Sequence, residues 1–174
     1  SEWLAESYPL QSQNHLEEAR RAARTATEKS ANFGFAWARL AELEFSFGRT
    51  AEALAALDKA LQLSPRNAQA VALKGFLLAA QNKIPVAREQ FETAIALDGA
   101  LGNAWLGRGL VRIRAGDAEG GRKDLQVAAA LEPQRALLRS YLGKAFANAN
   151  DAARALKELA LAQKLDPNDP TAWL

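Results

Sequence analysis

The side chains that most often carry out catalysis or bind metal ions are scarce in this chain. Its 174 residues include one histidine and no cysteine. His15 stands in the polar stretch SQNHLEE, with no second histidine to complete a metal pair. A lone histidine among polar neighbours is usually solvated, and neither a zinc site nor thiolate chemistry can be assembled from the remaining residues. The sequence therefore predicts no catalytic residue, no metal site and no cofactor.

The stretch GDAEGG at 116–121 has the glycine content of a phosphate-binding loop but lacks its setting. Such loops follow a β-strand and open a helix, and the sequence has no sustained apolar–polar alternation that would predict a strand. Adjacent carboxylates such as Glu17 and Glu18 are typical of an exposed helix face. We therefore expect that the chain is not an enzyme.

Basic residues cluster in one part of the chain, but the overall charge is nearly balanced. Lysine and arginine total 22 against 20 aspartates and glutamates, which leaves a formal charge of +2. The clustered residues are Arg108, Arg112, Arg114, Arg122, Lys123, Arg135, Arg139 and Lys144. Few aromatic residues stand beside them for stacking on bases, and a surplus of two charges gives no strong field. A nucleic-acid partner is therefore disfavoured.

The composition favours a folded domain and leaves its compartment open. Hydrophobic residues make up 49% of the chain, which is enough for a core and too many for a disordered segment. The longest apolar runs, such as residues 76–80, are far too short to span a bilayer, so no membrane insertion is expected. A cysteine-free chain suits a cytoplasm or a bacterial periplasm alike. The chain contains no methionine, and we expect a piece of a longer protein or a processed one.

A repeat of 34 residues organises the whole sequence. Tryptophans stand at 3, 37, 105 and 173, so their spacings of 34, 68 and 68 are one, two and two times 34. The same interval carries Asn or Gly, the residue types that best tolerate a left-handed backbone, at 14, 48, 82, 116 and 150. Alanine recurs at 26, 60, 94, 128 and 162, and Pro or Gly at 65, 99, 133 and 167. Internal repeats of this length are typical of helical arrays.

Each repeat is expected to contain two closely packed helices. The Asn/Gly positions divide it into two stretches of about three to four helical turns, and the Pro/Gly positions separate it from the next repeat. Small residues at a fixed interval indicate helices that approach closely, with Leu57, Phe91 and Leu125 as the larger side chains between them. Asp117 and Asp151 are predicted N-caps of second helices. The pattern therefore predicts an all-α solenoid of helical hairpins.

The sequence resembles the tetratricopeptide repeat family, whose helix-turn-helix unit carries the pattern W-x2-L-G-x2-Y, then A-x3-F, then P. The second repeat matches at Trp37, Leu40, Ala41, Ala53, Leu57, Ala60 and Pro65, the fourth at Trp105, Gly109, Leu125, Ala128 and Pro133, and the fifth at Leu142, Gly143, Phe146, Ala155, Leu159, Ala162 and Pro167. The units lie near 1–33, 34–67, 68–101, 102–135 and 136–169, and Trp173 opens a truncated sixth unit that begins at 170. The resemblance covers essentially the whole chain and implies one domain, 1–174, folded as an all-α right-handed superhelix of five repeats plus the start of a sixth.

Some slots that usually face a neighbouring helix hold charged residues. Lys74 and Arg108 occupy the leucine slot, and Glu44 and Arg112 occupy the tyrosine slot. Because burying an unpaired charge is costly, we expect these residues to pair between adjacent first helices, with Glu44 and Lys74 as a couple. The alternative is that their charged ends reach the surface. Pro9 and the polar run SQN predict that the first helix of repeat one is irregular or frayed.

The resemblance also implies a ligand groove on the concave face, lined by the first helix of each repeat. The family's groove slots in this chain are apolar at the centre and polar at the rim. They are Phe35, Glu42, Phe45, Gln69, Ala72, Phe76, Asn103, Leu106, Leu110, Ile113, Arg114, Lys144 and Asn148, and repeat one would add Leu4, Tyr8 and Gln11. The alternative for Phe45 and Ile113 is that they only pack against adjacent helices. Ala38, Ala72 and Leu106 stand where a lysine would help to clamp a terminal carboxylate, so a carboxylate clamp is disfavoured.

A large apolar patch on a protein surface usually marks an interaction site. We therefore expect a non-catalytic scaffold that binds a peptide or helix of a partner protein in the concave groove, with an apolar segment favoured over an acidic tail. The alternative is self-assembly through an exposed C-terminal end, where Leu159 and Leu165 would lie uncovered, or a spacer role within a larger protein. Groove binding predicts sensitivity to Phe76→Arg, and end-stacking predicts sensitivity to Leu159→Arg.

Overall fold

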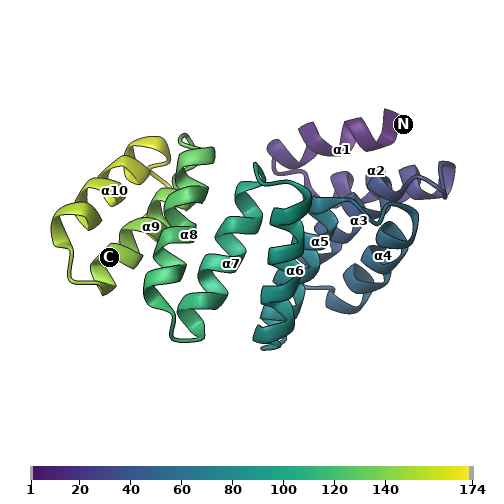
Figure 1. The fold of residues 1–174 in the computed structure, drawn as a ribbon. Coiled ribbons are helices and arrows are strands. Elements are labelled where there is room, and N and C mark those ends of the chain that lie inside the picture. Colours follow the sequence, from purple (N-terminus) through teal and green to yellow (C-terminus); the bar gives the residue numbers. More distant parts are fainter. Residues whose placement is uncertain (1, 173–174) are drawn as a thin grey trace.

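The structure, a computed structural model, describes residues 2–172 and places ten α-helices and one short 3-10 helix in them, with no strand. The elements are α1 (Glu2–Ser12), α2 (Leu16–Lys29), α3 (Gly34–Ser46), α4 (Thr50–Leu63), α5 (Ala68–Ala80), α6 (Ile84–Leu97), α7 (Gly102–Arg114), α8 (Ala118–Leu131), α9 (Ala136–Asn148), α10 (Ala152–Leu165) and η1 (Pro170–Ala172). Each helix packs against its neighbours in sequence, so hairpins stack side by side into a curved array (Figure 1). The expected all-α superhelix of helical hairpins is confirmed.

Each hairpin turns at a residue with a left-handed backbone. The φ angles are 62° at Asn14, 71° at Gly48, 61° at Asn82, 94° at Gly116 and 57° at Asn150. Glycine has no Cβ to clash in this region, and asparagine tolerates it because its short polar side chain can bond locally. The repeated Asn and Gly positions in the sequence therefore mark the hairpin turns.

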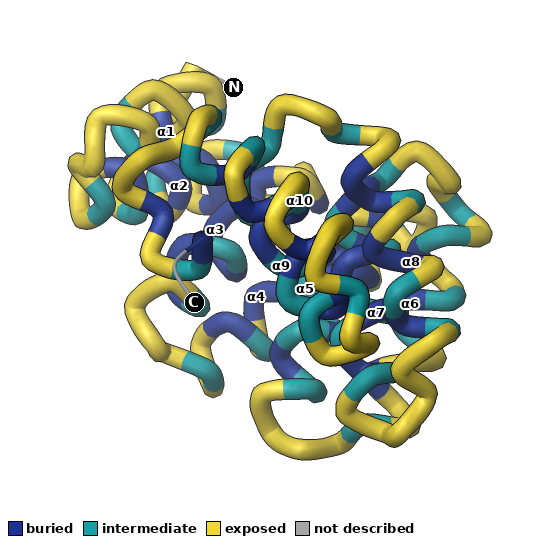
Figure 2. Tube along the Cα trace, turned by 90° about the vertical axis from the view of Figure 1, so that its left-hand side faces the viewer, coloured by how far each residue is buried: buried dark blue, intermediate teal, exposed yellow. Residues whose placement is uncertain are grey.

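Small residues bring the two helices of each hairpin together. The repeated alanines Ala26, Ala60, Ala94, Ala128 and Ala162 have no exposed surface. Buried stretches run along the helices, whereas the connecting turns are mostly exposed (Figure 2). The predicted caps are confirmed, since Asp117 accepts a hydrogen bond from the Gly120 amide at 2.8 Å and Asp151 accepts one from the Arg154 amide at 3.1 Å.

Phe91 of α6 fills a space that leucine fills in other hairpins. Its ring is fully buried between α5 and α7, where Gly75 and Gly107 leave room for it. A Cβ added at Gly107 would lie 2.1 Å from Cε1 of Phe91, and one added at Gly75 would lie 2.8 Å from the same atom. This ring and that of Phe76 pack edge to face, with centroids 4.9 Å apart and an interplanar angle of 72°. The buried Phe91 ring therefore packs against the Phe76 ring.

The first helix of repeat one is regular, so the expectation that Pro9 interrupts it is wrong. Helix α1 is continuous over Glu2–Ser12, with Pro9 inside it. Proline removes one helical hydrogen bond, but hydrogen bonds from Arg39 of the next repeat hold α1 in place near Pro9. The buried guanidinium of Arg39 donates to Ser7 Oγ at 3.0 Å and to the Ser7 carbonyl at 2.9 Å. These contacts fix α1 on α3.

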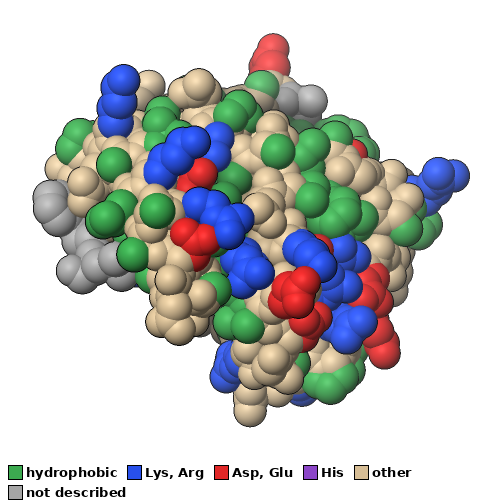
Figure 3. Space-filling model, turned by 60° about the vertical axis from the view of Figure 1, so that its left-hand side comes forward, with side chains coloured by type: hydrophobic (Ala, Val, Ile, Leu, Met, Phe, Trp, Pro, Cys, Tyr) green, Lys and Arg blue, Asp and Glu red, His purple; other side chains and the backbone are tan. Residues whose placement is uncertain are grey.

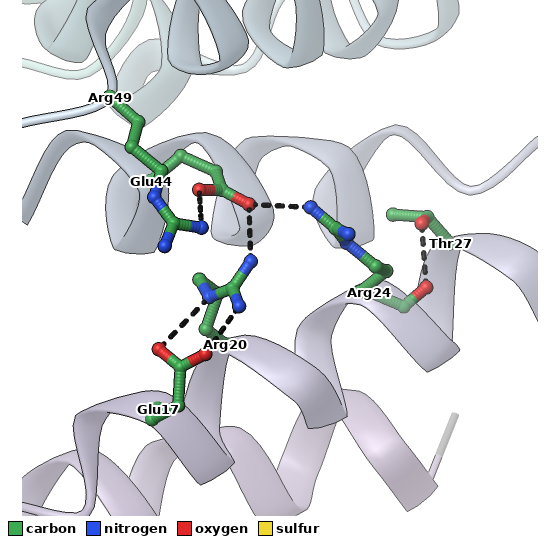
Figure 4. A network of polar contacts seen from close by, with 6 residues as sticks. All are labelled: Glu17, Arg20, Arg24, Thr27, Glu44 and Arg49. Atoms are coloured by element: carbon green, nitrogen blue, oxygen red, sulfur yellow. Dashed lines mark hydrogen bonds and ion pairs between the residues drawn. The ribbon is translucent and has the colours of Figure 1, made fainter. Parts of the chain in front are cut away.

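The charged residues in the family slots have partners other than those expected. Glu44 is buried, and its carboxylate accepts hydrogen bonds from the guanidinium groups of Arg20 at 3.2 Å, Arg24 at 2.9 Å and Arg49 at 3.3 Å (Figure 4). Lys74 instead reaches Asp58 of α4 at 3.2 Å. The expected pairing of Glu44 with Lys74 is therefore wrong.

The remaining slots show why that expectation fails. Arg108 and Arg112 of α7 both bind Asp124 of α8, at 2.8 Å and 3.0 Å. Arg139 of α9, which stands in the tryptophan slot of the fifth repeat, binds Glu158 of α10 at 3.0 Å. These slots face second helices, and their partners come from there and not from the adjacent first helix.

The C-terminal end is more fully covered than expected. Leu159 is only 5% exposed because it packs inside its own hairpin, where its Cγ lies 2.7 Å from the position of a Cβ on Gly143. The prediction that Leu159 is uncovered is therefore wrong, and Leu165 is half-buried. Leu156, on the outer side of α10, is 66% exposed. Trp173, which the sequence places at the opening of a sixth repeat, lies outside the described residues.

A buried carboxylate holds η1 on the last hairpin. Asp169 accepts hydrogen bonds from Ser140 Oγ of α9 at 2.9 Å, from the Thr171 amide at 2.9 Å and from the Thr171 hydroxyl. Burial alone would raise the pKa of Asp169, but the hydrogen bonds from Thr171 and Ser140 outweigh it and hold the pKa below its usual range. Gln163 Nε2 also donates to the Ala172 carbonyl at 3.3 Å. The turn after α10 is thus fixed against α9 and α10.

Candidate functional site

The first helices of the leading repeats enclose a cavity of about 270 Å³. Helices α3, α5 and α7 are neighbours in space, because the repeat places each first helix beside the next. The lining residues come from these helices, from α1 and from the turns that precede α5 and α7. They are Tyr8, Phe35, Ala38, Arg39, Glu42, Asn67, Gln69, Ala70, Ala72, Leu73, Phe76, Leu101 and Asn103. The cavity is large enough for one side chain and part of a main chain of a ligand.

Three aromatic rings give the cavity its apolar character. Tyr8 and Phe35 are 52% and 51% exposed, so much of each ring is open to solvent. Phe76 is half-buried and rests on Phe91. The cavity therefore presents two solvent-accessible rings, those of Tyr8 and Phe35, and a third ring, Phe76, that packs against Phe91. Exposed aromatic surface of this kind is favourable to bury in a complex.

The charged groups in the lining neutralise each other. Arg39 donates to a carboxylate oxygen of Glu42 at 2.8 Å, and its guanidinium carbon lies 4.2 Å from the ring centroid of Tyr8. Arg39 is buried and Glu42 is half-buried. Because the two charges form an ion pair, the lining carries no net charge. A charged ligand group would gain little there.

Side-chain amides supply further polar groups of the lining. Asn67 caps α5, with its Oδ1 accepting a hydrogen bond from the Ala70 amide at 3.2 Å. Asn103 uses its Oδ1 to accept a hydrogen bond from Arg135 at 2.7 Å. Gln69 is exposed. With the oxygens of Asn67 and Asn103 occupied, the donors that these two amides retain are their NH2 groups.

The cavity brings together part of the predicted groove. The predicted residues that line it are Phe35, Glu42, Gln69, Ala72, Phe76 and Asn103. Tyr8, which the resemblance added from repeat one, lines it as well. These residues come from four successive first helices, as the groove slots require. Their role in binding a peptide stays a prediction.

The other predicted groove residues lie elsewhere. Leu106 is 4% exposed and belongs to the core around α7, α8 and α9. Phe45 packs against the core of the first repeats, and Leu110 and Ile113 pack against the same core as Leu106. The outer polar members Arg114, Lys144 and Asn148 do not line the cavity; Arg114 donates to the Ala79 carbonyl at 3.4 Å. The apolar side chains in these slots pack between helices, which leaves less apolar surface in repeat four than the sequence suggests.

The lining also contains residues that the sequence did not predict: Arg39, Asn67, Ala70, Leu73 and Leu101. Asn67 and Leu101 precede α5 and α7, and the family slots used for prediction cover only positions within helices. An asparagine directly before the apolar run of residues 68–80 is a helix-start signal. That signal predicts the cap at Asn67 but not its place beside a cavity.

About half of the basic residues, 12 of the 22 lysines and arginines, form ion pairs with carboxylates of the described residues. Charges of both signs are interspersed on the face drawn in Figure 3.

The described residues contain no group of three or more side chains arranged to hold a metal ion. His15 is exposed and lies 3.8 Å from a carboxylate oxygen of Glu18. Over residues 2–172, none of the helices combines the length and the apolar character that crossing a membrane requires.

The stacked hairpins and the shared slots define a helical-repeat protein. A family model described as tetratricopeptide repeat matches residues 34–77, and another of the same description matches residues 73–136 and 106–170. Together the matched residues make up more than half of the chain. The chain belongs to the tetratricopeptide repeat family.

Two curated proteins share part of the sequence. The mouse protein O-mannosyl-transferase TMTC1 is 34% identical over 97 residues, which cover 53% of this chain and 10% of that protein. Anaphase-promoting complex subunit 3 of Schizosaccharomyces pombe is 29% identical over 121 residues, which cover 70% of this chain and 18% of that protein. The chain therefore spans less than a fifth of the length of either relative.

Solved structures share the fold at low sequence identity. A thermophilic tetratricopeptide repeat protein of Thermus thermophilus, TTC0263, superposes with a TM-score of 0.86 at 19% identity over 98% of this chain and 93% of that one. The tetratricopeptide repeat protein YrrB, described as having an unusual peptide-binding site, gives a TM-score of 0.62 at 19% identity over 98% and 88% of the two chains. Repeats of this family generally mediate protein–protein interactions and are generally non-catalytic.

Proposed function

We propose that this chain binds a segment of a partner protein on the face formed by its first helices, with the cavity lined by Tyr8, Phe35 and Phe76 as the anchoring point. The observation that carries the proposal is this cavity, which joins aromatic rings from three successive first helices, two of them, Tyr8 and Phe35, solvent-accessible. Burying an apolar side chain of the partner there contributes about 1.5–3 kcal/mol before the costs of association. The interaction is non-catalytic.

The neighbours in sequence and structure support this proposal. YrrB shares the fold and is described as having a peptide-binding site. Anaphase-promoting complex subunit 3 is by name a component of a multisubunit assembly. Both are consistent with a chain whose role is to hold another protein.

The test is a selection of peptides from a random-sequence library displayed on phage. Phe35→Arg is the diagnostic variant, because Phe35 lines the cavity, is 51% exposed and has little packing to lose. Phe33→Arg is the matched control, since Phe33 lies 5.7 Å from Phe35 between ring centroids, is 38% exposed and is absent from the lining. We expect selected peptides to bind wild type and Phe33→Arg alike, and to bind Phe35→Arg about a hundredfold more weakly. Selected peptides whose affinity is unchanged by Phe35→Arg would contradict groove binding.

Self-association is a second candidate, and one feature of the last hairpin favours it. Leu156 is 66% exposed beside a shallow hollow lined by Ala147, Asn150, Ala152 and Ala155. An exposed leucine next to an apolar hollow can pack against a second copy of the chain. If it does so, sedimentation will show concentration-dependent dimers that Leu156→Arg abolishes. A monomer at all accessible concentrations would remove this candidate.

A further inference from the structure

The first and the last hairpin lie at opposite ends of the array, with α1 in one and α10 in the other (Figure 1). Inside the array each second helix packs against the next first helix, as α2 does against α3 and α8 against α9. Among the described residues, only the short η1 follows α10. A side of α10 that corresponds to a covered side of the earlier second helices is therefore open.

The exposed side of α10 combines apolar and positively charged residues. Leu156 is 66% exposed, whereas Leu54, at the same slot three repeats earlier, is half-buried and packs against the core of the first repeats. The other charged residues of α10, Arg154 and Glu158, have ion-pair partners, but its two lysines have none among the described residues. The exposed residues beside Leu156 recur at intervals of four, three and four, and so share one side of the helix: Ala153, Lys157, Ala160 and Lys164.

The exposed side of α1 carries the opposite charge. Glu2, Glu6 and Pro9 are exposed and share one side of this helix, which contains no basic residue. Neither glutamate forms an ion pair with a described residue. The residues at the slots of Glu2 and Pro9 in the next first helix are Ala36 and Leu43, and both have no exposed surface. This side of a first helix is therefore the one that normally packs inside the array.

The charges indicate which surface can cover α10. Two copies of α10 facing each other would bring their unpaired lysines together, and adjacent like charges are unfavourable. The α1 helix of a second copy instead brings two unpaired carboxylates to two unpaired ammonium groups, beside Leu156. An antiparallel α1 places Glu2 toward Lys164. Glu6 then lies toward Lys157.

We propose that copies of this chain associate head to tail, with the outer side of α1 of one copy packing on α10 of the next around Leu156, and with the glutamates of α1 facing the lysines of α10. This inference rests on the self-association candidate and names the surface that meets Leu156. An interface between two different surfaces leaves one α1 and one α10 open after each step. Association therefore continues beyond a dimer, into a filament or a closed ring.

Reversing the charge at one end tests this arrangement. Glu6→Lys and Lys157→Glu each replace an attraction with a repulsion, and both positions are exposed, so the variants are expected to fold. Glu52→Lys and Lys59→Glu are the controls, because they make the same charge changes at exposed positions of α4. In sedimentation velocity, we expect each end variant to associate about tenfold more weakly than wild type, and each control to match wild type.

A mixture of the two end variants separates head-to-tail association from other modes. The lysine introduced on α1 then meets the glutamate introduced on α10, and the unaltered ends of the two variants meet each other. We expect the equimolar mixture to associate as strongly as wild type. If wild type associates but stops at a dimer, or the mixture associates no better than the separate variants, the head-to-tail arrangement is overturned and self-association stands. A wild type that stays monomeric overturns both and leaves groove binding untouched.

Discussion

Replacing Glu44 with alanine is expected to lower the free energy of unfolding by about 3 kcal/mol, at the lower end of the range for breaking a buried ion pair. The Glu44 side chain is 2% exposed and holds Arg20, Arg24 and Arg49 together across α2, α3 and the turn after α3. Without it, the Arg20 side chain, which is 12% exposed, loses its buried partner and keeps only Glu17. The side chains of Arg24 and Arg49 are 52% and 41% exposed and can turn to water, which limits the loss.

Two variants separate this effect from that of an ordinary surface pair. Asp58→Ala removes the partner of Lys74, whose side chain is 31% exposed while that of Asp58 is 64% exposed, and it should cost less than about 1 kcal/mol. Glu44→Gln keeps the shape of the side chain and removes its charge. Urea unfolding of the three variants measures the differences. A loss for Glu44→Ala no larger than that for Asp58→Ala would show that the network does not stabilise the repeat.

Replacing Gly107 with alanine is expected to lower the free energy of unfolding by about 2 kcal/mol, although alanine favours a helix over glycine by about 1 kcal/mol. The new Cβ would lie 2.1 Å from Cε1 of Phe91 and 2.3 Å from its Cζ. The ring cannot move aside, because it is fully buried and contacts Gly75 on its other side. The clash therefore separates α6 from α7 or forces Phe91 off its preferred rotamer.

Phe91→Leu is expected to rescue Gly107→Ala, because leucine is the residue that fills this slot at Leu57, Leu125 and Leu159. Gly99→Ala is the control substitution, since the nearest atom to its Cβ would be the Ile95 carbonyl oxygen at an ordinary 3.8 Å. Thermal unfolding should place the double variant above Gly107→Ala and Gly99→Ala near wild type. Equal stability of Gly107→Ala and wild type would contradict the packing described for Phe91.

The regular features of the fold could be predicted because they recur at every repeat. A left-handed turn needs Asn or Gly, and two close helices need alanine, so Asn82 and Ala94 reveal their roles by their spacing alone. The helix starts at Gly34, Ala68, Gly102 and Ala136 coincide with the first residues of the expected units. Each of these choices is local and is repeated, so a single sequence suffices to detect it.

Features that depend on which way a side chain turns could not be predicted from spacing. The partner of Glu44 is decided by the facing second helix, where Arg20 and Arg24 happen to stand, and not by the repeat pattern. Pro9 is tolerated because Arg39 ties Ser7 to the next repeat, a contact between residues 32 apart in the sequence. Leu106 occupies a groove slot but turns into the core, so the accessible apolar surface gathers in the leading repeats.

The binding site itself is tested most directly by hydrogen exchange of the backbone amides, with and without a selected peptide. We expect slower exchange in the first turns of α3, α5 and α7 and around Asn67, the segments that line the cavity. The last hairpin, including Leu156, should exchange at its unbound rate. Protection confined to α10, or no protection at all in the presence of a bound peptide, would contradict a binding site on the first helices.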